Sequence, residues 1–128
     1  MLALILSLTM AVSHPSILSV PVVHAEYLTK NELVAIATST AERHGLTKKQ
    51  VKEMLLVVDC ESGWIATSTG ALGERGLAQI YGKYHPDITE KQMLDPYFSL
   101  DFIARNLFKH PTWWTCYKLV TDGFLFFL

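Results

Sequence analysis

The sequence predicts a mainly α-helical domain, and three observations carry that prediction. Three segments begin with a capping box, in which a threonine and a Glu or Gln three residues later satisfy free backbone amides at a helix start. The apolar residues that follow recur at the spacing of one helix face. One glycine-rich stretch, 63–76, interrupts this pattern and indicates a loop or a small irregular hairpin. The length of 128 residues favours one domain.

The first predicted helix follows the box 29–32 and is stopped by Gly45. Its apolar residues share a broad face: Leu33, Val34, Ile36, Ala37 and Ala41. A second box, 47–50, starts a helix with apolar residues at i, i+3, i+4 and i+7: Val51, Met54, Leu55 and Val58. Glu61 comes one helical turn after Val58, so we expect it at the C-terminal end of this helix, oriented towards the interior.

After the glycine-rich stretch, residues 76–81 form a short apolar segment of open secondary structure, and 84–86 indicate a turn. A third box, 89–92, predicts a short helix that ends near Leu94. Asp95-Pro96 then supplies an N-cap and a proline at the first helical position. The apolar face of that helix is predicted to run to about Lys109 through Leu100, Ile103, Ala104, Leu107 and Phe108.

The C-terminal part has two features. Thr112 is the predicted cap of a last short helix through Trp113, Trp114 and Cys116. We place the domain boundary at 118 and treat 119–128 as an apolar tail, which either packs on the core as a strand or reflects a truncated reading frame.

The N-terminal segment, 1–25, contains no Asp, Glu, Lys or Arg and holds the apolar stretch Leu2 to Val12. Small residues in Val23-His24-Ala25 fit signal-peptidase cleavage after Ala25, although no Lys or Arg precedes the apolar stretch. We therefore predict a signal peptide, and a mature domain from residue 26 that is exported to the periplasm, the cell wall or the medium. An uncleaved anchor and a mature helix are the alternatives.

The overall charge excludes some partners. The chain has a net charge of −1, and 50% of its residues are hydrophobic. Nucleic-acid binders carry a basic patch, and membrane tethers carry clustered basic residues. We expect neither partner, no stable membrane span in the mature chain, and a monomer.

The chain has two cysteines, Cys60 and Cys116. In an exported protein an even count indicates a disulfide. It would close a loop of about 57 residues and stabilise the fold by about 4 kcal/mol. Two free buried thiols are the alternative. No His or Cys pair stands at the spacing of a zinc site, so we predict no metal.

Glu61 stands where an apolar helix ends, which is a costly place for a charge. Burial raises the pKa of a carboxyl, and the negative end of a helix acts in the same direction. Such a group can donate a proton and then retrieve one, as cleavage of a glycosidic bond requires. A glutamate at a helix end is also commonly a solvated surface residue.

The surroundings of Glu61 favour the chemical interpretation. Three elements follow one another: Glu61-Ser62-Gly63-Trp64, Gly70-Ala71 and Gly76-Leu77-Ala78-Gln79-Ile80. Their order and distances resemble the motif series of the SLT-type lytic transglycosylases, lysozyme-fold enzymes that cut bacterial peptidoglycan. Asp95-Pro96 followed by Ser99-Leu100 is similar to the later Asn-Pro-x-x-Asn-Ile helix start of that family.

The resemblance covers roughly residues 33–117 and implies a lysozyme-like fold, with several short helices around a substrate groove. It implies that Glu61 is the single catalytic acid/base and that Ser62 and Gln79 hold the substrate. Gly76 matches a glycine where the backbone approaches substrate or neighbouring chain. The residues themselves leave alternatives open, because Ser62 could end the helix with its hydroxyl and Gln79 could satisfy local backbone.

The family mechanism needs one carboxyl and no cofactor. Glu61 would protonate the oxygen between N-acetylmuramic acid and N-acetylglucosamine in peptidoglycan glycan strands, while the N-acetyl group stabilises the sugar cation. Glu61 would then activate the muramyl 6-hydroxyl, which closes a 1,6-anhydro ring.

One family element is missing, the Ala-Tyr-Asn triplet whose tyrosine hydrogen-bonds the catalytic glutamate. Tyr81 and Tyr117 are the candidates to replace it, with core packing as the alternative. Trp114 would lie near Glu61 if the two cysteines pair, and its indole would deepen the apolar setting of the carboxyl.

Two other functions remain open at this stage. A hydrolytic lysozyme-type muramidase would use a second carboxylate to position water, and Glu74 on the glycine-rich stretch is its candidate. Asp87 and Asp95 are better explained as a turn residue and an N-cap. A catalytically weak wall-binding module with the same fold is the other alternative.

Overall fold

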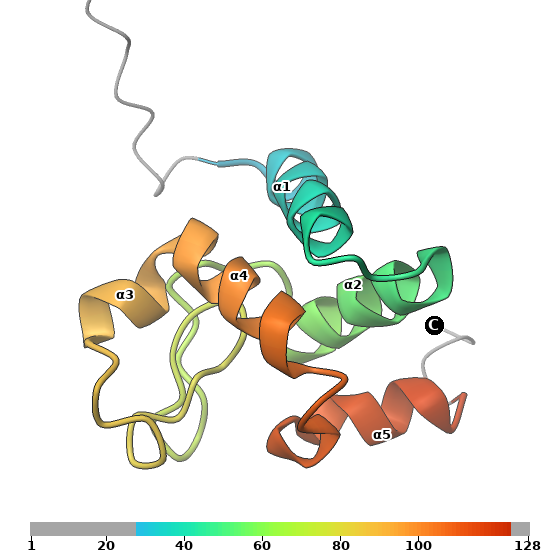
Figure 1. The fold of residues 1–128 in the computed structure, drawn as a ribbon. Helices are drawn as coiled ribbons and strands as arrows, with labels where there is room; N and C mark the ends of the chain where they lie inside the picture. Colours follow the sequence, from blue (N-terminus) through green and yellow to red (C-terminus); the bar gives the residue numbers. More distant parts are fainter. Residues whose placement is uncertain (1–27, 124–128) are drawn as a thin grey trace, which may run out of the picture.

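The computed structural model describes residues 28–123, and these residues are mainly helical, as predicted (Figure 1). The elements in chain order are α1 (Lys30–Arg43), α2 (Lys48–Ser62), α3 (Glu90–Leu94), α4 (Pro96–Asn106), the 3₁₀ helix η2 (Pro111–Trp113) and α5 (Thr115–Thr121). The predicted signal peptide, 1–25, and the last part of the predicted tail, 124–128, lie outside the described residues. No helix within the described residues is both long and apolar enough to cross a bilayer.

The three predicted capping boxes are confirmed. The threonine at 29, 47 or 89 accepts a hydrogen bond from the amide three residues later, and the Glu or Gln there accepts one from the threonine amide. The predicted cap at Asp95 is also present, because its carboxylate accepts from the amide of Phe98 at 2.8 Å. Local side chains therefore set the starts of four helices.

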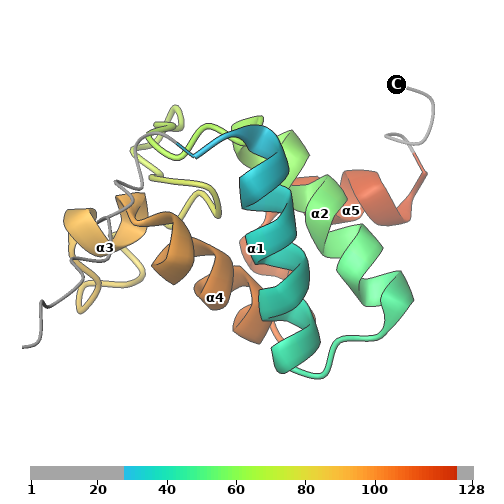
Figure 2. The same ribbon diagram turned by 90° about the horizontal axis from the view of Figure 1, so that it is seen from above.

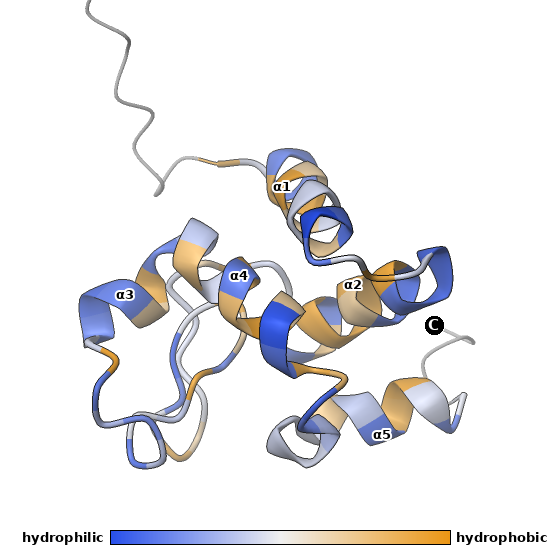
Figure 3. Cartoon of the chain, in the orientation of Figure 1, coloured by the Kyte–Doolittle hydropathy of each residue, from blue (hydrophilic) through white to orange (hydrophobic). Residues whose placement is uncertain are grey.

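The helices enclose one apolar core. Helix α1 packs against α2 and α4, α5 packs against α2, and α3 packs against α4 (Figures 1 and 2). The predicted inner faces supply fully buried residues, among them Met54 and Val58 of α2 and Leu100 and Ile103 of α4. In Figure 3 the apolar stretch of α2 follows its polar first turn. Glu61 comes after the buried residues Val57 and Val58, in the last turn of this helix.

The end of α4 differs from the prediction. The helix ends at Asn106 rather than near Lys109. Pro111 restricts the preceding His110 to non-helical backbone angles, φ −134° and ψ 57°. The chain turns there, and the amide of His110 donates to the carbonyl of Asn106 at 2.8 Å.

The prediction that Thr112 caps the last helix is wrong. Thr112 lies inside η2, and α5 begins at Thr115, with Trp114 at the cap position and no side-chain cap from that residue. The helix continues across the predicted boundary at 118 to Thr121, with Val120 buried. Its first turn finds a partner on another element, which a search for local caps does not detect.

The segment between α2 and α3 is a loop held by isolated bridges, Thr69 to Arg75 and Arg75 to Ile80. Gly76 has φ 77° and is buried, and an added Cβ would overlap the carbonyl oxygen of Met93. This glycine therefore serves close approach to the neighbouring chain. Leu77, a fully buried residue, helps to anchor the loop although it lies outside helix and strand.

Ser99 ties this loop to α4. The serine is fully buried, and its Oγ accepts a hydrogen bond from the amide of Ala78 at 2.8 Å. We expect Ser99→Ala to destabilise the protein by about 1–3 kcal/mol, because a buried amide loses its acceptor. Denaturant unfolding measures this change. Ser39→Ala on the exposed side of α1 is the control, with an expected change within about 0.5 kcal/mol. Equal effects of the two substitutions would contradict the assignment.

Candidate active site

Glu61 lies in the last turn of α2, before Gly63 ends the helix in the left-handed conformation at φ 58°. The amide of Gly63 donates to the carbonyl of Asp59, as a glycine at this position commonly does. Glu61 forms part of the wall of a cavity of about 420 Å³. The other walls come from the glycine-rich loop, the segment 78–85, α4 and the chain around η2.

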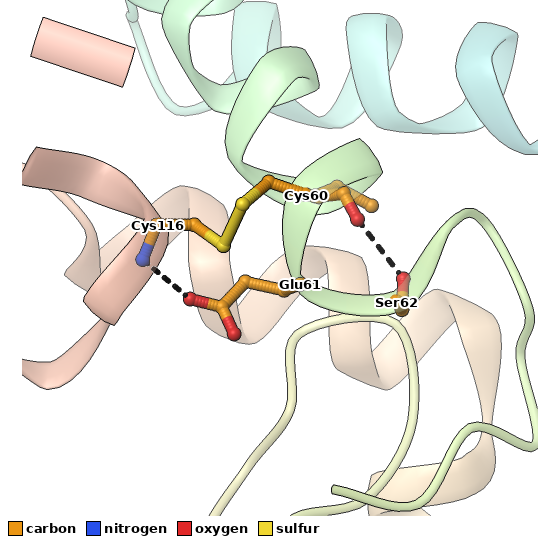
Figure 4. The surroundings of a disulfide bond; sticks show 5 residues. Cys60, Glu61, Ser62 and Cys116 are labelled. Carbon is orange, nitrogen blue, oxygen red and sulfur yellow. Dashed lines mark hydrogen bonds between the residues drawn. A yellow bond between two sulfur atoms is a disulfide. The ribbon is translucent and has the colours of Figure 1, made fainter. Parts of the chain in front are cut away.

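One oxygen of the Glu61 carboxyl has a fixed partner. Oε1 accepts a hydrogen bond from the backbone N–H of Cys116 in the first turn of α5, at 3.0 Å (Figure 4). Cys116 is also joined to Cys60 by the predicted disulfide, with Cα atoms 5.9 Å apart. Among residues 28–123, no group donates a hydrogen bond to Oε2. The site therefore holds one carboxyl oxygen and leaves the other available.

Burial raises the pKa of Glu61 above its ordinary value. The N–H of Cys116 opposes this rise because it stabilises the carboxylate, and the nearby charge of Glu74 adds to the rise. The pKa of Glu61 is therefore raised, as the sequence predicts. The sequence alone did not indicate the opposing hydrogen bond from α5.

The raised pKa has a consequence for stability. A carboxyl that binds its proton more tightly in the folded state stabilises the protein below its unfolded-state pKa, and that stability is lost as pH rises through the folded-state pKa. We expect Glu61→Gln to unfold at a higher temperature than wild type near pH 7, with the gap shrinking below about pH 4. Calorimetry at both pH values measures the gap. A gap independent of pH would contradict the burial argument.

Glu74 lines the same cavity as Glu61. Its Oε2 accepts from the amide of Leu72 at 3.0 Å, and none of the ion pairs among the described residues includes it. An added Cβ at Gly70 would overlap this carboxyl oxygen. Gly70 therefore leaves the space that the Glu74 side chain occupies at the cavity wall.

Gln79 also lines the cavity, in a left-handed backbone conformation with φ 48°. Its Nε2 donates to the carbonyls of Gly76 at 2.9 Å and Ser68 at 3.3 Å. The side chain thus satisfies local backbone, as one interpretation of the sequence had it. Its Oε1 lies close to Gly70, because an added Cβ at that glycine would be 2.6 Å from this oxygen. The Glu74 carboxyl also lies close to Gly70.

Aromatic side chains form much of the remaining wall. Trp114 is buried, and its Nε1 donates to the carbonyl of Ala78 at 2.8 Å, so the indole is fixed beside the cavity. Trp113 is 47% exposed, and its ring stacks on His110 with centroids 4.3 Å apart. Tyr84, also exposed, meets Tyr81 edge to face at 5.2 Å. Flat apolar surface with polar edges therefore forms part of the cavity wall.

His85 completes this wall, packed edge to face between Phe102 at 5.1 Å and Trp113 at 4.8 Å. Burial lowers the pKa of His85, because the charged form is poorly solvated there. The ring is therefore neutral near pH 7, and it contributes a flat surface rather than a positive charge.

Glu74, the candidate second carboxylate of the hydrolytic alternative, lines the cavity. Of the seven residues predicted to be catalytic or substrate-binding in a transglycosylase, four also line it: Glu61, Gln79, Tyr81 and Trp114. The other three do not. Ser62 is buried and its Oγ donates to the carbonyl of Val58 at 3.0 Å, Gly76 packs on Met93, and Tyr117 packs on Phe108 with ring centroids 6.0 Å apart.

Sequence reasoning missed the amide of Cys116 as the partner of Glu61, and it missed Tyr84 and Phe102 in the wall. The predicted disulfide could have indicated the Cys116 amide as a partner, because pairing Cys60 with Cys116 brings the start of α5 beside Glu61. No comparable signal marks the aromatic residues, which come from separate elements.

Within the described residues, no group of three His, Cys, Asp or Glu side chains could hold a metal ion. Comparison with protein-family models, curated proteins and solved structures found no match to this chain.

Proposed function

We propose that the protein is a peptidoglycan lytic transglycosylase with a lysozyme-like fold. One observation carries the proposal: Glu61 is a half-buried carboxyl with a raised pKa, and it lies in the wall of an aromatic-lined cavity. A carboxyl in such a setting suits proton transfer to a glycosidic oxygen. The ordered motifs around Glu61 add the resemblance to the SLT-type family.

In the first step, Glu61 donates its proton to the oxygen that links N-acetylmuramic acid to the next N-acetylglucosamine. The bond between that oxygen and the muramyl C1 breaks, and the bond electrons leave with the oxygen. The N-acetyl group of the same muramyl residue stabilises the cation at C1. The aromatic wall provides flat surfaces on which sugar rings can stack.

In the second step, the Glu61 carboxylate takes the proton from the muramyl 6-hydroxyl. The 6-oxygen bonds to C1 and closes the 1,6-anhydro ring, which restores the protonated carboxyl. The unpaired oxygen Oε2 suits both transfers, because Oε1 is held by the amide of Cys116. No cofactor or metal takes part in this scheme.

Product analysis tests the proposal. We expect purified protein to release muropeptides with 1,6-anhydro ends from isolated murein, each lighter by one water than the hydrolysed product. Mass spectrometry separates the two. If the products have only reducing ends, the protein is a hydrolase rather than a lyase. Binding of murein without cleavage would favour a wall-binding module.

The hydrolytic alternative has one observation in its favour, which is the second carboxyl, Glu74, in the same cavity. A carboxylate opposite the acid can position a water for attack on C1. If wild type gives a mixture of ends, Glu74→Gln should reduce the reducing-end share while anhydro ends persist. An unchanged ratio would exclude Glu74 from that role.

A further inference from the structure

The catalytic carboxyl lacks a tyrosine partner, and a backbone group takes that place. Tyr81 packs against Tyr84 and Tyr117 packs against Phe108, and neither hydrogen-bonds Glu61. The N–H of Cys116 donates to Glu61 Oε1 at 3.0 Å instead. This amide lies in the first turn of α5, where it has no carbonyl partner within its own helix.

The disulfide ties this donor to the acid. Cys60 immediately precedes Glu61 on α2, and it is bonded to Cys116, the residue that carries the donating N–H (Figure 4). The disulfide, the peptide bond between Cys60 and Glu61, and the hydrogen bond from Cys116 to Glu61 therefore belong to one closed ring. Trp114, two residues before Cys116, is anchored separately, because its Nε1 donates a hydrogen bond to the carbonyl of Ala78 at 2.8 Å.

We propose that the Cys60–Cys116 disulfide is a positioning element of the site, which holds the backbone N–H of Cys116 against Oε1 and presents Oε2 of Glu61 to the substrate. The kinetic part of this inference rests on the proposed function. The hydrogen bond itself and its dependence on the disulfide do not.

The groups around Glu61 determine in which direction its pKa should change when the disulfide is removed. The other titratable groups that line the cavity are Glu74, Tyr81, Tyr84 and His85, and none of them hydrogen-bonds Glu61. The Cys116 amide is thus the one group identified that favours the carboxylate. Without the disulfide, the amide is no longer held while Trp114 stays anchored to Ala78, so we expect the pKa of Glu61 to rise further.

The first test needs no substrate. In NMR titrations of the oxidised protein, we expect the amide proton of Cys116 to shift with the same midpoint as the side-chain carboxyl carbon of Glu61. In Glu61→Gln the amide shift should become independent of pH, because glutamine accepts the bond without titrating. An amide shift in wild type that does not follow Glu61 would overturn the assignment of the donor.

The second test removes the disulfide by combining Cys60→Ser with Cys116→Ser. Cys60→Ala with Cys116→Val is a second version that keeps apolar packing if the serine pair does not fold. Circular dichroism sets a temperature at which the variant is folded. We expect the amide of residue 116 to lose its coupling to Glu61, and the pKa of Glu61 to move upward.

The same variants should cleave murein with kcat about tenfold lower at similar KM, because a misplaced acid weakens the chemical step more than substrate binding. The alkaline limb of the pH profile should move to higher pH. A folded variant with unchanged amide coupling, kcat and pH limb would overturn the positioning role. If wild type cleaves no murein, the NMR results still decide whether the disulfide holds the hydrogen bond.

Discussion

Replacing Glu61 by glutamine is expected to lower the rate of murein cleavage by about 10²–10⁴-fold. Glutamine keeps the shape of the side chain and can accept the hydrogen bond from Cys116. It cannot donate a proton to the glycosidic oxygen or take one from the 6-hydroxyl. Turbidity clearance of isolated murein, followed by product analysis, measures the loss.

Glu53→Gln is the matched control. Glu53 lies on the same helix, pairs with Lys49 at 3.8 Å and does not line the cavity. We expect near wild-type cleavage from this variant. Equal clearance by Glu61→Gln and wild type would exclude both the lyase and the hydrolase, because both need this proton donor.

Glu61→Gln therefore gives two independent results. Loss of cleavage reports on chemistry, whereas the pH-dependent gain in thermal stability reports on burial of the carboxyl. If the variant shows the gain in stability but retains cleavage, Glu61 is a buried carboxyl but not the catalytic acid. If the variant loses cleavage without the pH-dependent gain in stability, Glu61 is the catalytic acid, but burial is not the cause of its raised pKa.

The predictable part of the fold rests on local contacts. The helices that follow Thr29, Thr47, Thr89 and Asp95 begin where predicted, because each cap bonds an amide only three residues away. The inner face of α2 follows from apolar spacing in the same way, and that spacing placed Glu61 at its end.

The unpredicted part depends on contacts between distant residues. The start of α5 could not be found from a local cap, since the acceptor for its first turn is Glu61 on α2. The backbone of Gln79 adopts φ 48°, a left-handed conformation that sequence periodicity does not detect. Ser62 follows Glu61 directly, yet its hydroxyl bonds back along α2 and stays outside the cavity.

Contacts between distant residues also set the electrostatic balance at Glu61. Burial and the nearby charge of Glu74 disfavour the carboxylate, and the negative end of α2 acts in the same direction. The amide of Cys116 opposes them by stabilising the charged form. In the proposed mechanism, the acid step and the base step would therefore both depend on the approach of α5.

Loss of the disulfide is expected to cost about 4 kcal/mol of folding free energy, since it closes a loop with a sequence separation of 56. Such a cost is large against the 5–15 kcal/mol that is typical of whole domains. The thermal midpoint should fall by at least about 15 °C. Scans of the protein with and without reductant measure the difference.

The variant that combines Cys60→Ala with Cys116→Val is the control, because reductant should leave its midpoint unchanged. Its own midpoint should lie below that of oxidised wild type and near that of the reduced protein. Similar midpoints for oxidised and reduced wild type would contradict the stabilising role. That result would still leave the hydrogen bond to Glu61 to be decided by the amide titration, because a link can orient a side chain without contributing to global stability.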